Sequence, residues 1–210
     1  MKYIFVSGAP GSKWSSVVKN IYFSPDIDRS DYRNEWTYYH DASGQKELMH
    51  IGAYFDPGME SNLPENFCEY PKTELEKIFD QPFDPDSTGI RIIKSHIFSN
   101  NIEFLRRLWP EVPVVLVHRS DDACLGWWVK CGHFDITYPL YHSYYQDFKK
   151  MASIIKQQNT GIINAIWDHK FCLNSPSSNY DLCMALGIQQ PPSEYRQNYS
   201  NSDITVKVIK

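Results

Sequence analysis

The sequence predicts an α/β fold, a parallel β-sheet flanked by helices, in a single domain spanning residues 1–210. Residues 90–94, 100–109 and 113–117 read as strand, helix and strand, at the spacing of a right-handed βαβ unit. Residues 2–7 are an apolar, β-branched and aromatic run that ends at Gly8, as a buried strand does. A length of 210 residues suits one domain with a sizeable core.

The remaining elements are expected to be mainly helices. Patterns of apolar residues and helix-start signals predict helices over 15–22, 71–80, 121–130, 138–158, 160–170 and 180–186. Residues 24–46 are polar and turn-rich, and no element is assigned to them. After Pro191 and Pro192 the chain is expected to end in a polar segment.

Composition excludes several functional classes. Lys and Arg number 21 against 25 Asp and Glu, a net charge of −4, so we expect neither nucleic-acid nor membrane-surface binding. No apolar run is long enough to span a bilayer, and residues 1–8 lack the pattern of a signal peptide. The five cysteines are odd in number and include no C-x-x-C pair, so we expect a reduced, cytoplasmic protein. Aromatic residues make up 15%, which suggests a core or pocket built from rings.

The loop after the first strand has the chemistry of a phosphate cradle. Residues 8–16 read G-A-P-G-S-K-W-S-S and lead into a helix, whose first N–H groups can bind an anion. The pattern G-x-x-x-x-G-K-[ST] fails here, because Lys13 and Trp14 stand where it needs Gly and Lys. The alternative is a plain Gly-Pro turn.

Two further strands end in polar side chains, at the sheet edge where α/β proteins bind ligands. The strand 90–94 leads into Lys94, Ser95 and His96; the histidine suits a general base, or alternatively a helix cap. The strand 113–117 is followed by His118 and Arg119. The arginine matches phosphate oxygens, or alternatively pairs with Asp121 or Asp122 of the next helix.

Taken together, these three segments resemble the sulfotransferases that use 3′-phosphoadenosine-5′-phosphosulfate (PAPS). In that family a first loop reads P-K-S-G-T-T-W, a later strand ends in K-T-H, and a third ends in an Arg. The resemblance covers residues 3–22 and 90–130 and implies a P-loop-like sulfotransferase fold. The implied cofactor-binding residues are Pro10, Gly11, Ser12, Lys13, Trp14, Ser15, Ser16, Lys94 and Arg119. The implied catalytic residues are His96 as general base and Lys13 as charge stabiliser, with no metal.

The chain departs from the family pattern at several positions. The family's loop lysine falls on Gly11, its tryptophan on Ser16, and its serine eight residues after the arginine on Trp127. The R-K-G signature found near the C-terminus of many members is absent. Lys13 can replace the loop lysine from a shifted position, and Trp14 can either stack on the adenine or belong to the core.

The acceptor implied by the resemblance is a small molecule, glycan or peptide bearing a hydroxyl or amine. Its site is expected at residues 50–59 and around Tyr138, Tyr141, Tyr144 and Tyr145, although spacing favours core packing for these tyrosines. The run of Asp26, Asp28 and Asp31 is expected to be solvated surface rather than a Ca²⁺ site. A P-loop kinase and an inactive nucleotide-binding module are the alternative functions.

Overall fold

The computed structural model describes residues 1–32, 39–40, 47–48, 51–59, 61–130, 146–196 and 203–210. Within these residues the main sheet contains β1 (Tyr3–Gly8), β4 (Arg91–Lys94), β5 (Val114–Arg119), β6 (Leu173–Asn174) and β7 (Ile204–Ile209), while β2 (Tyr39–His40) pairs with β3 (Glu47–Leu48). The helices are α1 (Trp14–Tyr22), α2 (Lys72–Asp80), α3 (Ile102–Leu108), α4 (Asp121–Lys130), α5 (Phe148–Trp167) and α6 (Asn179–Leu186). Short 3-10 segments are η2 (Phe67–Glu69), η3 (His96–Asn100) and η5 (Ser193–Tyr195).

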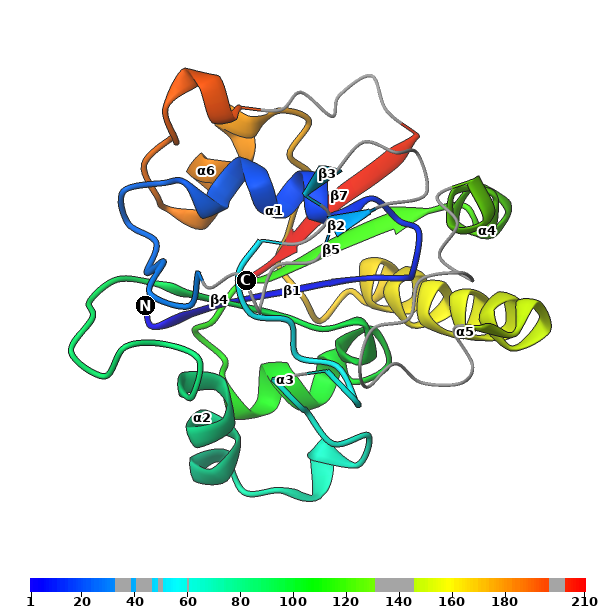
Figure 1. Ribbon diagram of the computed structural model, residues 1–210, viewed down its shortest axis with the longest axis horizontal. Helices are drawn as coiled ribbons and strands as arrows, with labels where there is room; N and C mark the ends of the chain where they lie inside the picture. The colour runs from blue at the N-terminus through cyan, green and yellow to red at the C-terminus, as the bar shows by residue number, and fades with distance from the viewer. Residues whose placement is uncertain (33–38, 41–46, 49–50, 60, 131–145, 197–202) are drawn as a thin grey trace.

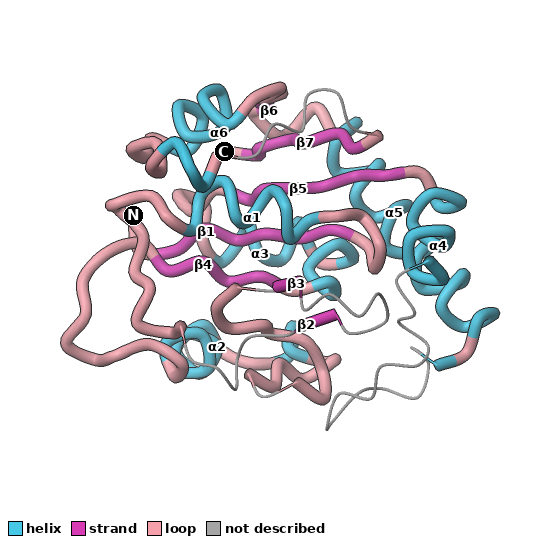
Figure 2. The backbone as a smooth tube through the Cα atoms, turned by 45° about the horizontal axis from the view of Figure 1, so that its top comes forward, coloured by secondary structure: helices cyan, strands magenta, loops and turns pink. Residues whose placement is uncertain are grey.

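The sheet is mixed rather than parallel, which corrects the sequence-based prediction. Its order is β4-β1-β5-β7-β6, and Figure 2 shows the longer strands running side by side. The expected parallel strands β4, β1 and β5 are present, but β7 lies antiparallel to β5, and β6 antiparallel to β7. The predicted polar C-terminal end is therefore wrong, because residues 204–209 form a strand whose Val206, Val208 and Ile209 are buried.

Helices cover both faces of the sheet (Figure 1). On one face, α1 and α6 pack against Ile4, Val6, Val115 and Val117. On the other, α2, α3 and α5 pack against residues that include Phe5, whose ring lies 5.3–5.7 Å from those of Phe79, Phe98 and Trp109. The expectation of a ring-built core is confirmed on this second face.

Residues 148–167 form one helix, so the expected boundary between 158 and 160 is wrong. Gly161 lies inside α5 where the carbonyl oxygen of Ser99 approaches, and a Cβ atom there would overlap it. Glycine thus serves close packing against η3 rather than ending the helix. The first eight residues of the helix predicted over 138–158 lie outside the described residues.

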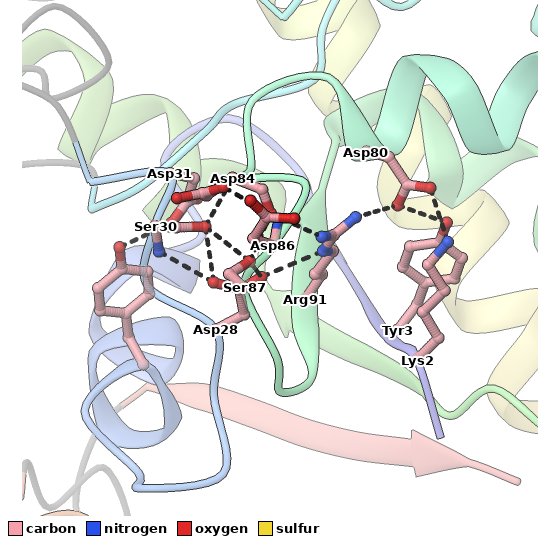
Figure 3. Close-up of polar contacts among 11 residues, drawn as sticks. Lys2, Tyr3, Asp28, Ser30, Asp31, Asp80, Asp84, Asp86, Ser87 and Arg91 are labelled. Carbon is pink, nitrogen blue, oxygen red and sulfur yellow. Dashed lines mark hydrogen bonds and ion pairs between the residues drawn. The ribbon is translucent and has the colours of Figure 1, made fainter.

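Asp28 and Asp31 are buried, so the expectation that this run is solvated surface is wrong for these two, while Asp26 is partly exposed. Asp28 accepts hydrogen bonds from Ser30, Ser87 and the Arg91 Nε atom, the last at 3.1 Å (Figure 3). Burial raises the pKa of Asp28, but these hydrogen bonds outweigh it and hold the pKa below its usual range.

Arg91 joins this cluster to the start of the sheet. Its NH1 atom lies 2.6 Å from an oxygen of Asp80, which also accepts hydrogen bonds from Tyr3 and Lys2 (Figure 3). Arg91 and Tyr3 begin β4 and β1, so this network lies at the edge opposite the carboxyl ends of these strands. It holds the scaffold together and leaves the other edge for the site.

Candidate functional site

The three predicted site segments meet at one edge of the sheet. β1 is the middle of the parallel strands, with β4 on one side and β5 on the other. His96 Nδ1 hydrogen-bonds the carbonyl oxygen of Gly8, while Arg119 NH1 donates to the carbonyl oxygen of Gly11 at 2.9 Å. The loop after β1 is thus held from both sides, by His96, which follows β4, and by Arg119, the last residue of β5.

The loop itself begins with a tight turn. Ser12 N donates to the carbonyl oxygen of Ala9 at 3.0 Å, with the buried Pro10 second in the turn and Gly11 third, at φ 80°. Proline second and a positive φ third are typical of a type II turn. The loop therefore contains the Gly-Pro turn that was considered as the alternative to a phosphate cradle. Two cationic residues, Lys13 and Arg119, lie beside this turn.

Replacing Gly11 with alanine is expected to destabilise the fold by about 1–3 kcal/mol. Alanine at this position would have an unfavourable positive φ, and its methyl group would overlap the backbone carbonyl of Cys124 in α4. Urea unfolding followed by tryptophan fluorescence measures the loss. Gly126→Ala is the matched control, because a Cβ atom at Gly126 meets nothing within 4 Å. Equal stability of the two variants would contradict the prediction.

His96 is buried and fixed in orientation. Its ring stacks on Trp14 with centroids 4.2 Å apart and an interplanar angle of 25°. Since a carbonyl oxygen only accepts, Nδ1 carries the proton in the bond to Gly8 and the basic lone pair is on Nε2. Burial lowers the pKa of His96, opposed by Asp56 and Gly8, and the net shift favours the neutral ring. His96 does not act as a helix cap; Ser95 occupies that position of η3.

Asp56 orients the backbone that carries His96, a role that the sequence analysis did not assign. One carboxylate oxygen accepts from Ser95 Oγ at 2.5 Å and from His96 N at 2.9 Å. Asp56 belongs to the segment 50–59 proposed to line the acceptor site, and Tyr54 of that segment lies edge-on to His96. His50 and Tyr138, Tyr141, Tyr144 and Tyr145 lie outside the described residues.

Lys94 is buried, and its side chain binds the backbone of this segment. Its ammonium donates to the carbonyl oxygens of Ile51 and Gly52, the latter at 3.3 Å. Asp31 lies nearby and accepts from Ala53 N at 2.7 Å and from the Tyr22 hydroxyl at 2.9 Å. Burial lowers the pKa of Lys94 to about 8, although Asp31 opposes the shift. Lys94 and Asp31 together therefore fix the backbone of residues 51–53 by hydrogen bonds.

Lys94 is expected to contribute a rise in stability with pH between about pH 8 and 9.5. Its pKa is about 8 when folded and 10.5 otherwise, so in this window the unfolded chain binds more protons than the folded one. This contribution should be absent in Lys94→Met. Unfolding free energies of both proteins at several pH values measure the difference, in which the opposing contributions of Cys124 and Cys183 above about pH 9, and of Tyr3 and Tyr22 above about pH 10, cancel. Parallel curves for protein and variant would contradict this assignment.

Lys13 and Arg119 converge on a single carboxylate. One oxygen of Asp203 lies 3.2 Å from Lys13 Nζ, and the other lies 2.6 Å from Arg119 Nε and 2.5 Å from Arg119 Nη2. Arg119 therefore pairs with Asp203, and not with Asp121 or Asp122, the partners considered from the sequence. Partial burial raises the pKa of Asp203, but the bonds from Arg119 and Lys13 outweigh it and hold the pKa below its usual range.

Trp127 lies among these cations. Lys13 Nζ is 4.9 Å from its ring centroid, and the Arg119 guanidinium and Lys130 Nζ are each 5.8 Å away. Trp127 stands where the sulfotransferase pattern has a serine, so an aromatic ring replaces a hydroxyl at this position. Lys130 joins the cationic group from α4, and sequence spacing alone did not single it out.

The first turn of α1 completes the site. Lys13 is its N-cap residue in the left-handed region, at φ 62°, and Ser16 N donates to the Lys13 carbonyl oxygen at 3.0 Å. Ser15 and Ser16 are half-buried on this turn. Ser12 Oγ is buried and has no hydrogen-bond partner among the described residues. Trp14 is 3% exposed and packs in the core, as one of its two considered roles requires.

Comparison with known proteins yields no match: no family model, no curated protein and no solved structure is similar to this chain. In the described ranges no helix is long and apolar enough to cross a membrane. The same ranges hold no group of three or more His, Cys, Asp or Glu side chains placed to bind a metal ion.

Proposed function

We propose that the protein is a sulfotransferase that transfers a sulfonate group from PAPS to a hydroxyl or amine of a small-molecule, glycan or peptide acceptor. The observation that supports this most is the convergence of Lys13 and Arg119 on one anion beside the loop after β1. His96, a neutral imidazole, lies at the other side of the same loop. A cationic pair and a base at one sheet edge are what anion-group transfer requires.

In this proposal the cationic group binds the phosphates of the nucleotide. The Arg119 guanidinium, held in place by the Gly11 carbonyl, offers a planar fork for the 3′-phosphate. Ser12, Ser15 and Ser16 supply hydroxyl donors for the 5′-phosphosulfate at the positive end of α1. Gly11 and Pro10 shape the turn that brings these donors together, while Lys94 and Trp14 support the site from the core.

The transfer step then needs one proton acceptor and one charge stabiliser. PAPS supplies the sulfonate and the leaving phosphate group. The acceptor oxygen forms a bond to sulfur as the bond from sulfur to the bridging phosphate oxygen breaks. His96 Nε2 takes the acceptor proton, and Lys13 stabilises the charge that grows on the bridging oxygen. Asp56 is a positioning residue here, because it holds the His96 backbone.

The proposed setting is the reducing cytoplasm. Cys68, Cys124, Cys172 and Cys183 are free thiols, and burial raises the pKa of Cys124 to about 12 and that of Cys183 to about 11. Thiols with raised pKa values are poor nucleophiles, which suits structural cysteines in a reduced compartment. These cysteines take no part in the proposed reaction.

Titration with adenosine 3′,5′-bisphosphate, the product of the donor, tests this function. In the presence of EDTA the protein is expected to bind it, and Arg119→Ala should weaken binding about 10- to 100-fold, as loss of charged hydrogen bonds does. Arg107→Ala is the matched control, since Arg107 is an exposed arginine on α3. Isothermal titration calorimetry measures the affinities, and thermal unfolding checks that each variant folds.

The alternatives predict different outcomes. A kinase on the same scaffold would prefer ATP with Mg²⁺ over the bisphosphate, and that preference would exclude the sulfotransferase. An inactive nucleotide-binding module would bind the bisphosphate but transfer no labelled sulfonate to a panel of phenols, sugars and tyrosyl peptides. Absence of binding to any nucleotide would remove the proposal altogether.

A further inference from the structure

Lys13 and Arg119 are bridged by an anionic side chain of the protein itself, that of Asp203. Asp203 directly precedes β7, and the antiparallel register pairs Arg119 with Ile204, the next residue. The register thus delivers the Asp203 carboxylate to the Arg119 guanidinium at the edge where the parallel strands end. Lys13 reaches it from the start of α1, 190 residues away in the sequence.

The contacts resemble those of a bound phosphate or sulfate group. Asp203 presents two oxygens to three nitrogen donors on two cationic side chains, at 2.5–3.2 Å. Arg119 is 8% exposed, so its charge requires an anionic partner in the folded protein. Asp203 is that partner: its carboxylate neutralises the guanidinium, so the folded protein needs no bound anion at Arg119.

Asp203 can also move its side chain away from Lys13 and Arg119. Its side chain is 46% exposed and that of Lys13 is 28% exposed, so solvent and solutes reach the pair. Rotation about the Cα–Cβ bond of Asp203 would free both cations without moving β7, whose backbone is fixed by pairing with β5. Arg119 would keep its orientation, since NH1 also donates to Gly11.

We propose that Asp203 is a resident anion that occupies the phosphate-binding position and must be displaced before a nucleotide binds. The inference rests on the proposed function for the identity of that ligand. A site that is open in only a fraction of molecules binds with an affinity reduced by that fraction. Asp203 therefore weakens ligand binding and favours ligands whose charge exceeds that of one carboxylate, such as a phosphate dianion.

The variant Asp203→Asn tests this, with adenosine 3′,5′-bisphosphate and inorganic sulfate as probes. The amide keeps the size of the side chain but removes the charge that competes. We expect it to bind both probes about tenfold more tightly or better, measured by calorimetry for the nucleotide and by sulfate-dependent thermal unfolding at constant ionic strength. The second readout also reports whether the variant folds.

A matched control separates displacement from general electrostatics. Asp122 is an exposed carboxylate in the first turn of α4, three residues after Arg119, so Asp122→Asn removes the same charge nearby. Its effect on both probes should stay below about twofold. An equal gain in the two variants would overturn the inference, because it would show a long-range charge effect only.

The outcomes distinguish this inference from the proposed function. If the protein binds the bisphosphate but folded Asp203→Asn binds it no more tightly, the resident-anion inference is wrong and the nucleotide site stands. If Asp203→Asn gains sulfate affinity while neither protein binds the bisphosphate, the resident anion stands and the nucleotide proposal is wrong.

Discussion

Replacing Arg91 with methionine is expected to lower the free energy of unfolding by about 3–5 kcal/mol. Methionine fills a similar volume but leaves Asp28 charged, with its side chain 2% exposed and its cationic partner gone. The Asp80 carboxylate also loses its ion pair with Arg91, in which the two atoms are 2.6 Å apart. An uncompensated buried charge is costly, whereas an apolar pair of similar shape is not. Urea unfolding followed by fluorescence measures the change.

Two further variants make this result specific. Arg107→Met removes an exposed arginine that lies over the Phe104 ring and should change stability by less than about 0.5 kcal/mol. Adding Asp28→Asn to Arg91→Met should recover part of the loss, because it removes the stranded charge. A loss below about 1 kcal/mol for Arg91→Met would show that the network in Figure 3 contributes little.

Replacing His96 with glutamine is expected to lower the rate of sulfonate transfer about 100- to 10,000-fold, the usual contribution of a positioned general base. Glutamine can still hydrogen-bond to Gly8 but cannot take a proton at neutral pH. Binding of adenosine 3′,5′-bisphosphate should stay within about threefold, since Lys13 and Arg119 are intact. Labelled-sulfonate transfer and calorimetry measure the two quantities separately.

The pH profile provides a readout that a structural role of His96 would not change. Because burial lowers the pKa of His96, its imidazole takes up a proton at a lower pH than an exposed histidine does, and the acid limb of the wild-type rate should be shifted to lower pH accordingly. His96→Gln should lack this limb. The control is His118→Gln, since His118 is half-buried on β5 and its pKa is also lowered by burial. Equal transfer rates for His96→Gln and the wild type would exclude the general base.

Local sequence patterns were sufficient to predict most of the helices and the parallel strands. The apolar run of β1, the amphipathic pattern of α1 and the strand–helix–strand spacing of residues 90–119 reflect contacts within a few residues or one crossover. The three site segments were also expected at one edge of the sheet, and they lie there, although Lys94 binds the carbonyl oxygens of residues 51 and 52 and does not join Lys13 and Arg119. Parallel strands that lie side by side bring their carboxyl ends to the same edge.

The pairing partner of a strand is not encoded locally, and here the prediction was wrong. Residues 204–209 alternate in a way typical of a strand, yet two prolines and a polar stretch precede them, and their direction depends on β5. The same holds for Asp28 and Asp31. Aspartates in a turn-rich segment suggest solvated surface, and two of the partners that make burial of Asp28 favourable, Ser87 and Arg91, lie 59 and 63 residues away in the sequence.

By itself, the sequence determined the three parallel strands and most of the helices, and it placed the loop after β1, His96 and Arg119 at one edge of the sheet. Only the tertiary structure decided that Lys94 lies under the site, that Trp14 belongs to the core, and that Asp203 bridges Lys13 and Arg119. The physical reason is range. Backbone preferences and apolar periodicity act between near neighbours, whereas ion pairs and desolvation act between groups that the chain brings together only on folding.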